Sequence, residues 1–89
     1  MSVIQSGLFL IMQRFPHHRD ILRDMYKQNH DFKVLCEDYQ KCSQALNFWL
    51  KSERNEAVTR CREYSHLLQD LEFEVNRSLD AMLGKGSSQ

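Results

Sequence analysis

Residues 25–49 decide the fold, and they read MYKQNHDFKVLCEDYQKCSQALNFW. Apolar side chains recur in this stretch at alternating steps of three and four residues, through Phe32 and Leu35 to Trp49. This spacing is typical of the a and d positions of a heptad on an α-helix, whereas a strand would alternate every second residue. The stretch therefore predicts a long helix with a coiled-coil-like apolar seam.

A second run with the same spacing extends from Ala57 to Met82. The two heptad frames do not join, because Trp49 and Ala57 are eight residues apart and seven would keep the phase. The slip falls within residues 51–56, all of which are polar. Ser52 in this segment is a competent helix N-cap. The mismatch therefore predicts that the chain turns back on itself here.

We therefore expect an all-α fold, a long antiparallel helical hairpin that resembles a coiled coil and spans residues 15–83. Its first helix is expected at about residues 16–51 and its second at about residues 56–83, with the turn at about 52–55. No Gly or Pro occurs between His17 and Leu83. Residues 84–89 are expected to form a flexible tail, since Gly84 is a natural helix stop.

Closing the hairpin at this turn predicts which seam residues face each other. Leu35 is expected opposite Leu71, and the two polar interruptions of the seam, Gln28 and Ser78, fall in one layer. A buried polar layer penalises slipped registers, so this pair is expected to set the register. The same layers would form within one chain or between two swapped chains, and both arrangements stay open.

Two helices bury only one stripe each, which is little for a domain of this size. The e positions of both heptads are apolar and extend the seam on one side, whereas the opposite flank of the first helix is acidic. We expect the apolar flank to pair two copies into a homodimeric four-helix bundle. The predicted dimer or partner flank consists of Leu22, Cys36, Leu50, Val58 and Leu79, and the acidic edge consists of Asp24, Asp31 and Asp38.

The N-terminal segment carries an uninterrupted apolar run from Leu8 to Met12. Five residues are far short of the 20 or so that span a membrane, and no basic residue precedes the run as in a signal peptide. Residues 1–14 are therefore expected to form a mobile leader, or alternatively an arm that docks on a partner or a second subunit. A cytoplasmic location without membrane contact is expected.

The chain has 89 residues, and its 12 basic and 12 acidic side chains give no net charge with neutral histidines. This length fits one domain. A neutral charge argues against a broad nucleic-acid-binding face, because such domains are usually strongly basic. A local basic turn is the alternative, and it would make the chain a nucleic-acid-associated regulator. That turn comprises Lys51, Arg54, Arg60 and Arg62.

The sequence has few candidates for catalytic, metal-binding or redox-active side chains. The three cysteines include no Cys-x-x-Cys pair and indicate free thiols in a reducing compartment. His17 and His18 lie near acidic residues at the start of the first helix, but a metal needs three or four convergent ligands. We expect no catalytic, metal or cofactor-binding residue and no enzyme activity. A thiol or metal sensor using Cys36 or His17 and His18 is a further alternative.

Residues 15–22 read FPHHRDIL and residues 31–39 read DFKVLCEDY. These motifs resemble the YdcH family of small bacterial proteins, whose members have FPEYRDLI followed by HFxxLFEEY or HFxxLFEEH at the same spacing. Residues 67–72, LLQDLE, are similar to a later stretch of that family, so the resemblance covers about residues 15–75. The family usually has His where this chain has Asp31. The resemblance implies a helical hairpin and no established chemistry.

These observations together predict a non-catalytic helical protein-interaction module. It is expected to associate with itself through the apolar helix flanks, and an unidentified protein is a further expected partner.

Overall fold

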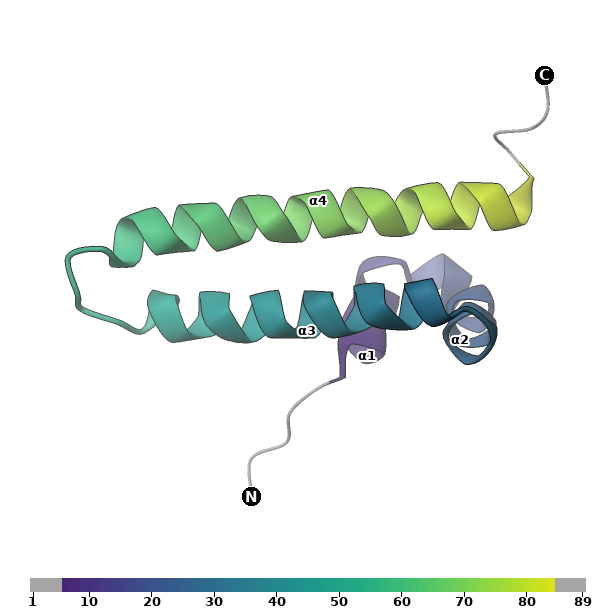
Figure 1. The fold of residues 1–89 in the computed structure, drawn as a ribbon, viewed down its shortest axis with the longest axis horizontal. Helices are drawn as coiled ribbons and strands as arrows, with labels where there is room; N and C mark the ends of the chain where they lie inside the picture. The colour runs from purple at the N-terminus through teal and green to yellow at the C-terminus, as the bar shows by residue number, and fades with distance from the viewer. Residues whose placement is uncertain (1–5, 85–89) are drawn as a thin grey trace.

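The computed structural model describes residues 6–84, and every regular element in that range is helical (Figure 1). The all-helical class predicted from the heptad spacing is therefore confirmed. Within the described range, no helix has both the length and the apolar character needed to span a bilayer. In chain order the elements are α1 (Gly7–Arg14), the short 3-10 helix η1 (Pro16–His18), α2 (Arg19–Gln28), α3 (His30–Leu50) and α4 (Ala57–Leu83).

The long helices α3 and α4 lie side by side, and the loop of residues 51–56 connects them at one end (Figure 1). Leu35 and Leu71 line one groove between the two helices, as the predicted layer requires. At its far end α4 stops at Gly84, whose φ of 75° is left-handed. Glycine adopts this conformation without steric cost, so Gly84 can end the helix. The rest of the predicted tail lies outside the described residues.

The prediction of one continuous first helix over residues 16–51 is wrong, because the chain bends at Asn29. This residue has an extended backbone, with φ −124° and ψ 111°, and its Oδ1 accepts a hydrogen bond from the Phe32 N–H at 3.1 Å. An Asn at this position satisfies an N–H that the first turn of a helix leaves without a partner. Consequently α2 turns away from the axis of α3 and is seen almost end-on in Figure 1.

The N-terminal segment is helical and docked from residue 7 onward, so the expectation of a mobile leader is wrong for residues 7–14. Ser6 caps α1 by accepting a hydrogen bond from the Phe9 N–H at 3.1 Å. Ile11 is completely buried against α2 and α3 within the same chain. The apolar run of this segment therefore belongs to the core. Residues 1–5 lie outside the described residues.

The start of α1 touches the backbone of α3, and this contact depends on Gly7. A β-carbon at this position would lie 1.8 Å from the Cys36 carbonyl oxygen, which is impossible. The Gly7 N–H also donates a hydrogen bond to Gln40 Oε1 at 3.0 Å. The missing side chain thus lets two helices approach more closely than side chains normally permit.

A polar cluster fastens the other end of α1 to the long helices. The Arg14 guanidinium contacts the Glu72 carboxylate through two nitrogens, at 3.0 and 3.2 Å. The Tyr39 hydroxyl donates a hydrogen bond of 2.6 Å to the same carboxylate. Glu72 therefore connects α1, α3 and α4 through one side chain.

The buried core is concentrated at the end of the molecule that α1 and α2 cover. Away from it, only Ala57 beside the loop is a buried apolar residue in the described range. The α3–α4 pair therefore extends beyond its own core. The buried cluster contains Ile11, Leu22, Met25, Phe32, Cys36, Tyr39, Val75 and Leu79.

Candidate functional site

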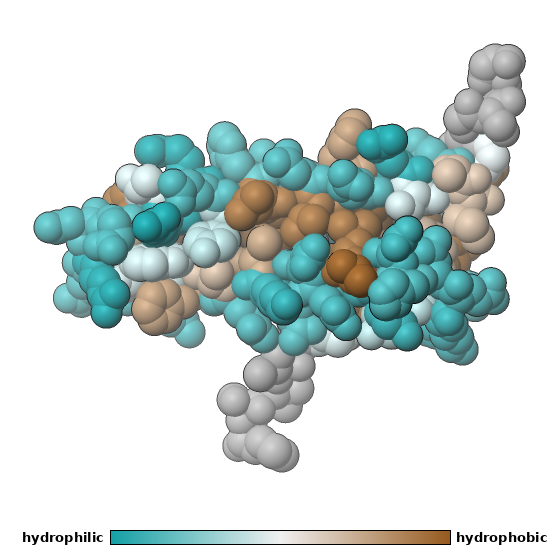
Figure 2. Space-filling view, viewed as in Figure 1, coloured by the Kyte–Doolittle hydropathy of each residue, from teal (hydrophilic) through white to brown (hydrophobic). Residues whose placement is uncertain are grey.

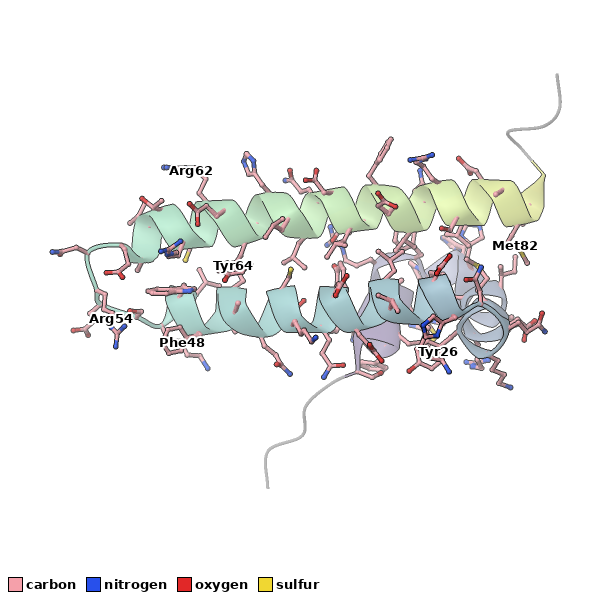
Figure 3. The ribbon with its side chains drawn as sticks, in the orientation of Figure 1. Tyr26, Phe48, Arg54, Arg62, Tyr64 and Met82 are labelled. Carbon is pink, nitrogen blue, oxygen red and sulfur yellow. The ribbon has the colours of Figure 1, made fainter. Side chains whose placement is uncertain are left out.

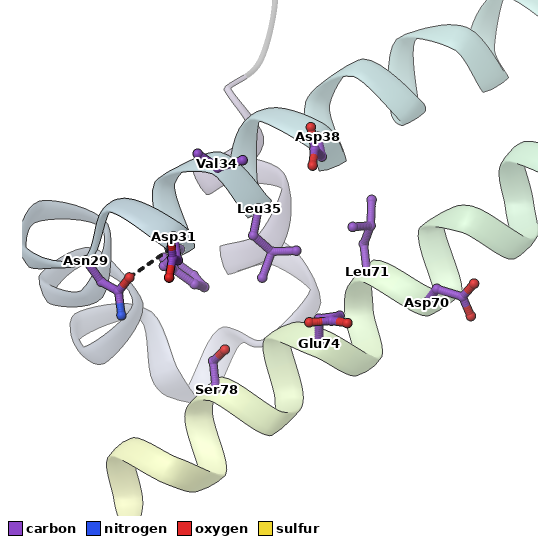
Figure 4. A pocket seen from close by; sticks show the side chains of 10 residues that line it. Asn29, Asp31, Val34, Leu35, Asp38, Asp70, Leu71, Glu74 and Ser78 are labelled. Carbon is purple, nitrogen blue, oxygen red and sulfur yellow. Dashed lines mark hydrogen bonds between the residues drawn. The ribbon is translucent and has the colours of Figure 1, made fainter.

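An open groove of about 390 Å³ runs between α3 and α4, and it is the best-defined candidate site (Figure 4). Leu35 and Leu71 project into it from the two helices and form an apolar floor with Phe32. Ser78 lies at the end of the groove, beside Asn29. The remaining lining residues are Val34 and the acidic Asp31, Asp38, Asp70 and Glu74.

The rim of this groove is negatively charged, and no basic side chain within the groove neutralises it. Four acidic side chains line it and no basic side chain does. Among residues 6–84, none of these four carboxylates forms an ion pair. An apolar floor inside an acidic rim fits a partner that presents an apolar side chain next to a cation.

The groove lies on the side of the α3–α4 pair away from α1. Helix α1 contacts Cys36 and Glu72, whereas the groove is lined by Asp38 and Glu74, two residues further along each helix. Two residues correspond to about 200° around a helix, so these pairs point in nearly opposite directions. Figure 2 shows an apolar strip between the long helices on the side that faces the viewer.

We call this side the open face. Residues seven positions apart along each helix share this side, so the open face extends beyond the groove along α3 and α4. On α3 and α4 the open face carries Asp31, Asp38, Ala45, Arg60, Leu67 and Glu74.

The opposite end of the pair, which we call the tip, comprises residues 48–62. Large apolar side chains are exposed there: Phe48 is 56% exposed, Leu50 63% and Val58 68%. The Phe48 ring meets the Trp49 ring edge to face, with centroids 5.1 Å apart. Leu50 and Val58 line one shallow pocket with Trp49 and Cys61, and exposed apolar side chains of this kind are typical of an interaction site.

Between the groove and the tip, the apolar seam is only half-buried. Tyr64 lies between the two helices (Figure 3), yet it retains partial exposure, as do Cys42, Leu46, Trp49, Cys61 and Leu68. The short helix α1 ends the coverage near Gln40, so two helices are left to shield this part of the seam alone. The side chains of this half are as apolar as those of a core, but two helices are too few to bury them fully.

The predicted dimer flank is divided by the fold. Leu22, Cys36 and Leu79 are at most 2% exposed, because they belong to the core that the helices of the same chain form together. Their assignment to a dimer surface is wrong for this reason. Leu50 and Val58, which α1 does not reach, remain exposed at the tip.

The predicted polar layer is also wrong as a buried contact. Gln28 is the exposed last residue of α2, and Ser78 is half-buried on α4. The helix break brings the neighbouring Asn29 into the groove beside Ser78 instead. The signal that could have revealed this is the Asn itself, a preferred N-cap, followed by Asp31 in the first turn.

The basic residues of the predicted turn do not converge on one patch. In Figure 3, Arg62 points away from α3, whereas Arg54 lies in the loop. Arg60 is ion-paired to Glu63 at 3.0 Å, with both side chains about half exposed. Lys51 ends α3, and Glu53 and Glu56 lie between these cations in the sequence.

The thiols and histidines of residues 6–84 show no arrangement typical of nucleophilic catalysis or metal binding. Burial, and then the nearby Glu37 carboxylate, raise the pKa of the Cys36 thiol to about 12. Burial and Asp38 also raise the pKa of Cys42. Neutral thiols are poor nucleophiles. His17 and His18 lie on η1, and no group of three or more potential metal ligands occurs among residues 6–84.

No family model matches this chain, and neither a curated protein nor a solved structure matches it. The resemblance to the YdcH family therefore stays a prediction that rests on the motifs of the chain itself.

Proposed function

We propose that this chain is a non-catalytic helical interaction module of the cytoplasm, similar to YdcH proteins, that associates with itself. The observation that carries the proposal is the unfinished burial of the α3–α4 pair beyond α1. Half-buried seam residues lie there, and the exposed side chains of Leu50 and Val58 flank them on the side that α1 covers further along the pair. Covering them completes a four-helix bundle, in which each helix buries a full apolar face.

The physical argument rests on how little two helices can bury. A domain of this size is marginal unless most of its apolar side chains are removed from water. Each large apolar side chain that moves from water to an interface contributes roughly 1.5–3 kcal/mol. The exposed residues of this region therefore favour association, and their burial opposes the entropy lost when two chains join.

Analytical ultracentrifugation of the full chain at micromolar concentration tests the proposal. We expect a dimer for the natural sequence and a monomer for the double variant Leu50→Gln, Val58→Gln. Phe73→Gln is the matched control, because Phe73 is 63% exposed on α4 but lies on its outer side. A monomer for the natural sequence over the whole accessible concentration range would overturn the proposal.

A further inference from the structure

The carboxylates of the groove between α3 and α4 do not stabilise the chain that carries them. Within residues 6–84, none of the four forms an ion pair or accepts a hydrogen bond. They are Asp31 and Asp38 on α3, and Asp70 and Glu74 on α4. Charged side chains that flank the seam of paired helices commonly form ion pairs between the helices. Here both helices present carboxylates, which repel each other, so cations supplied by a partner would remove a cost.

The basic side chains nearest in the sequence leave this charge in place. Lys41 follows Asp38 by three residues and Arg77 follows Glu74 by three, a spacing at which side chains can meet on a helix. In the described part of the chain, neither cation forms an ion pair. Arg60, further along the open face, is paired with Glu63 at 3.0 Å. The negative charge of the groove is therefore available to a partner.

An apolar stripe runs between the two rows of carboxylates. Figure 4 shows Leu35 and Leu71 between the acidic side chains of α3 and those of α4. Both leucines are only half-buried. Val34 in the same groove is 40% exposed, and Leu67, one turn from Leu71 along α4, is 46% exposed. An occupant of the groove gains free energy by removing these side chains from water.

The shape of the groove favours a helical occupant. Both of its walls are helices, and it is open along its length (Figure 4). A small molecule would leave much of its own surface in water, whereas small-molecule sites bury most of their ligand. An extended peptide would need a sheet edge to bind through its backbone, and every regular element of residues 6–84 is helical. A helix with one apolar side can lie along the groove and cover both leucines.

We propose that the open face binds a basic amphipathic helix of another protein. The apolar side of that helix packs on Leu35 and Leu71, and its Lys or Arg side chains pair with the carboxylates on both sides of the groove. This inference goes beyond the proposed self-association, which uses Leu50 and Val58 on the other side of the helix pair. Either proposal can therefore fail without the other.

The spacing of the carboxylates specifies the pattern of the partner. Asp31 and Asp38 are seven residues apart, which is about 10 Å along α3. Asp70 and Glu74 are four residues apart, which is about 6 Å along α4. The partner helix is expected to carry cations two turns apart along one edge of its apolar side and one turn apart along the other edge.

Fluorescence anisotropy with a labelled synthetic peptide tests the proposal on the full chain. The probe is a helix of about 18 residues, about 27 Å long, with leucines on one side and lysines along both edges of that side. One matched peptide has Glu in place of every Lys, and the other has the same residues in an order that leaves no apolar side. The probe is expected to bind at least roughly tenfold more tightly than either matched peptide, because only the probe complements both the apolar floor and the acidic rim.

Charge reversal in the groove gives the second arm of the experiment. Asp38→Lys with Glu74→Lys is expected to weaken binding of the probe by at least roughly tenfold. The matched control, Glu37→Lys with Glu53→Lys, changes the net charge equally at exposed positions outside the groove and is expected to leave the dissociation constant unchanged. Circular dichroism and urea midpoints confirm that each variant is folded. Equal losses in the two variants would overturn the proposal, because binding would then depend on net charge alone.

Amide chemical shifts of the isotope-labelled chain locate the bound probe independently. Shifts are expected at residues 31–38 and 67–78, and the variant Leu50→Gln, Val58→Gln is expected to bind the probe as tightly as the natural chain. Shifts confined to the surroundings of Leu50 and Val58 would refute the assignment to the open face. If the reordered peptide binds as tightly as the probe, the groove accepts any flexible polycation, and the helical partner is wrong. If the probe dissociates a dimer of the natural chain, a second copy occupies the open face, and the proposal is equally wrong.

Discussion

The close contact between α1 and α3 predicts that Gly7→Ala destabilises the protein, although alanine is the better helix former. In an exposed helix this change stabilises by up to about 1 kcal/mol. Here the new β-carbon would lie 1.8 Å from the Cys36 carbonyl oxygen and 2.6 Å from its carbonyl carbon. Both are backbone atoms and cannot rotate away, so α1 itself has to move.

The size of the effect follows from the distance that α1 must move. A separation of at least 3.0 Å requires the helices to part by at least 1.2 Å, the difference from the present 1.8 Å. Overpacking of this kind costs about 1–3 kcal/mol, and loss of the Gly7–Gln40 hydrogen bond adds about 1 kcal/mol. After subtraction of the gain in helix propensity, we expect a net loss of about 2 kcal/mol.

Urea unfolding followed by circular dichroism measures this loss as a lower midpoint. Gln13→Ala, at an exposed position of the same helix, is the matched control and is expected to leave the midpoint nearly unchanged. A midpoint for Gly7→Ala equal to or above that of the natural chain would refute the close approach of the two backbones.

The rate at which Cys36 reacts with a thiol reagent measures the displacement of α1 from α3 locally. This thiol is 1% exposed beneath α1, and its raised pKa further slows the reaction at neutral pH. Gly7→Ala is expected to accelerate labelling of Cys36 more than that of Cys61, which lies near the tip. Equal acceleration at both sites would indicate global unfolding rather than release of α1.

Two further substitutions probe the polar contacts that the fold created. Asn29→Ala is expected to cost about 1 kcal/mol in urea unfolding, because it removes the cap on Phe32, whereas Gln28→Ala is expected to be nearly neutral; equal costs would contradict the cap. Tyr39→Phe is expected to cost about 1 kcal/mol at neutral pH by removing the hydrogen bond to Glu72. Burial and then Glu72 raise the pKa of Tyr39 above its ordinary value of 10, so its contribution is complete below that pH and is lost as pH rises through the folded-state pKa. Tyr39→Phe should therefore reduce the loss of stability at alkaline pH, and an unchanged alkaline profile would contradict this assignment.

The sequence by itself determined the helical class, the place of the turn and the extent of the second helix. Heptad spacing and its phase slip near Ser52 are local signals, and they depend only on which side of a helix each residue occupies. The same spacing concealed the break at Asn29, because the apolar period continues across it. The capping of the Phe32 N–H by Asn29 ends one helix and begins the next, although the heptad spacing continues over several turns on both sides.

Only the tertiary structure decided what covers the apolar flank. The sequence identified Leu22, Cys36 and Leu79 as a surface that must be buried, and it assigned that burial to a second copy. The structure assigns it to the same chain, in which α1 covers Cys36, and the docking of α1 depends on the missing side chain of Gly7. Periodicity states which side of a helix avoids water, whereas the identity of its neighbour depends on contacts between segments distant in the chain.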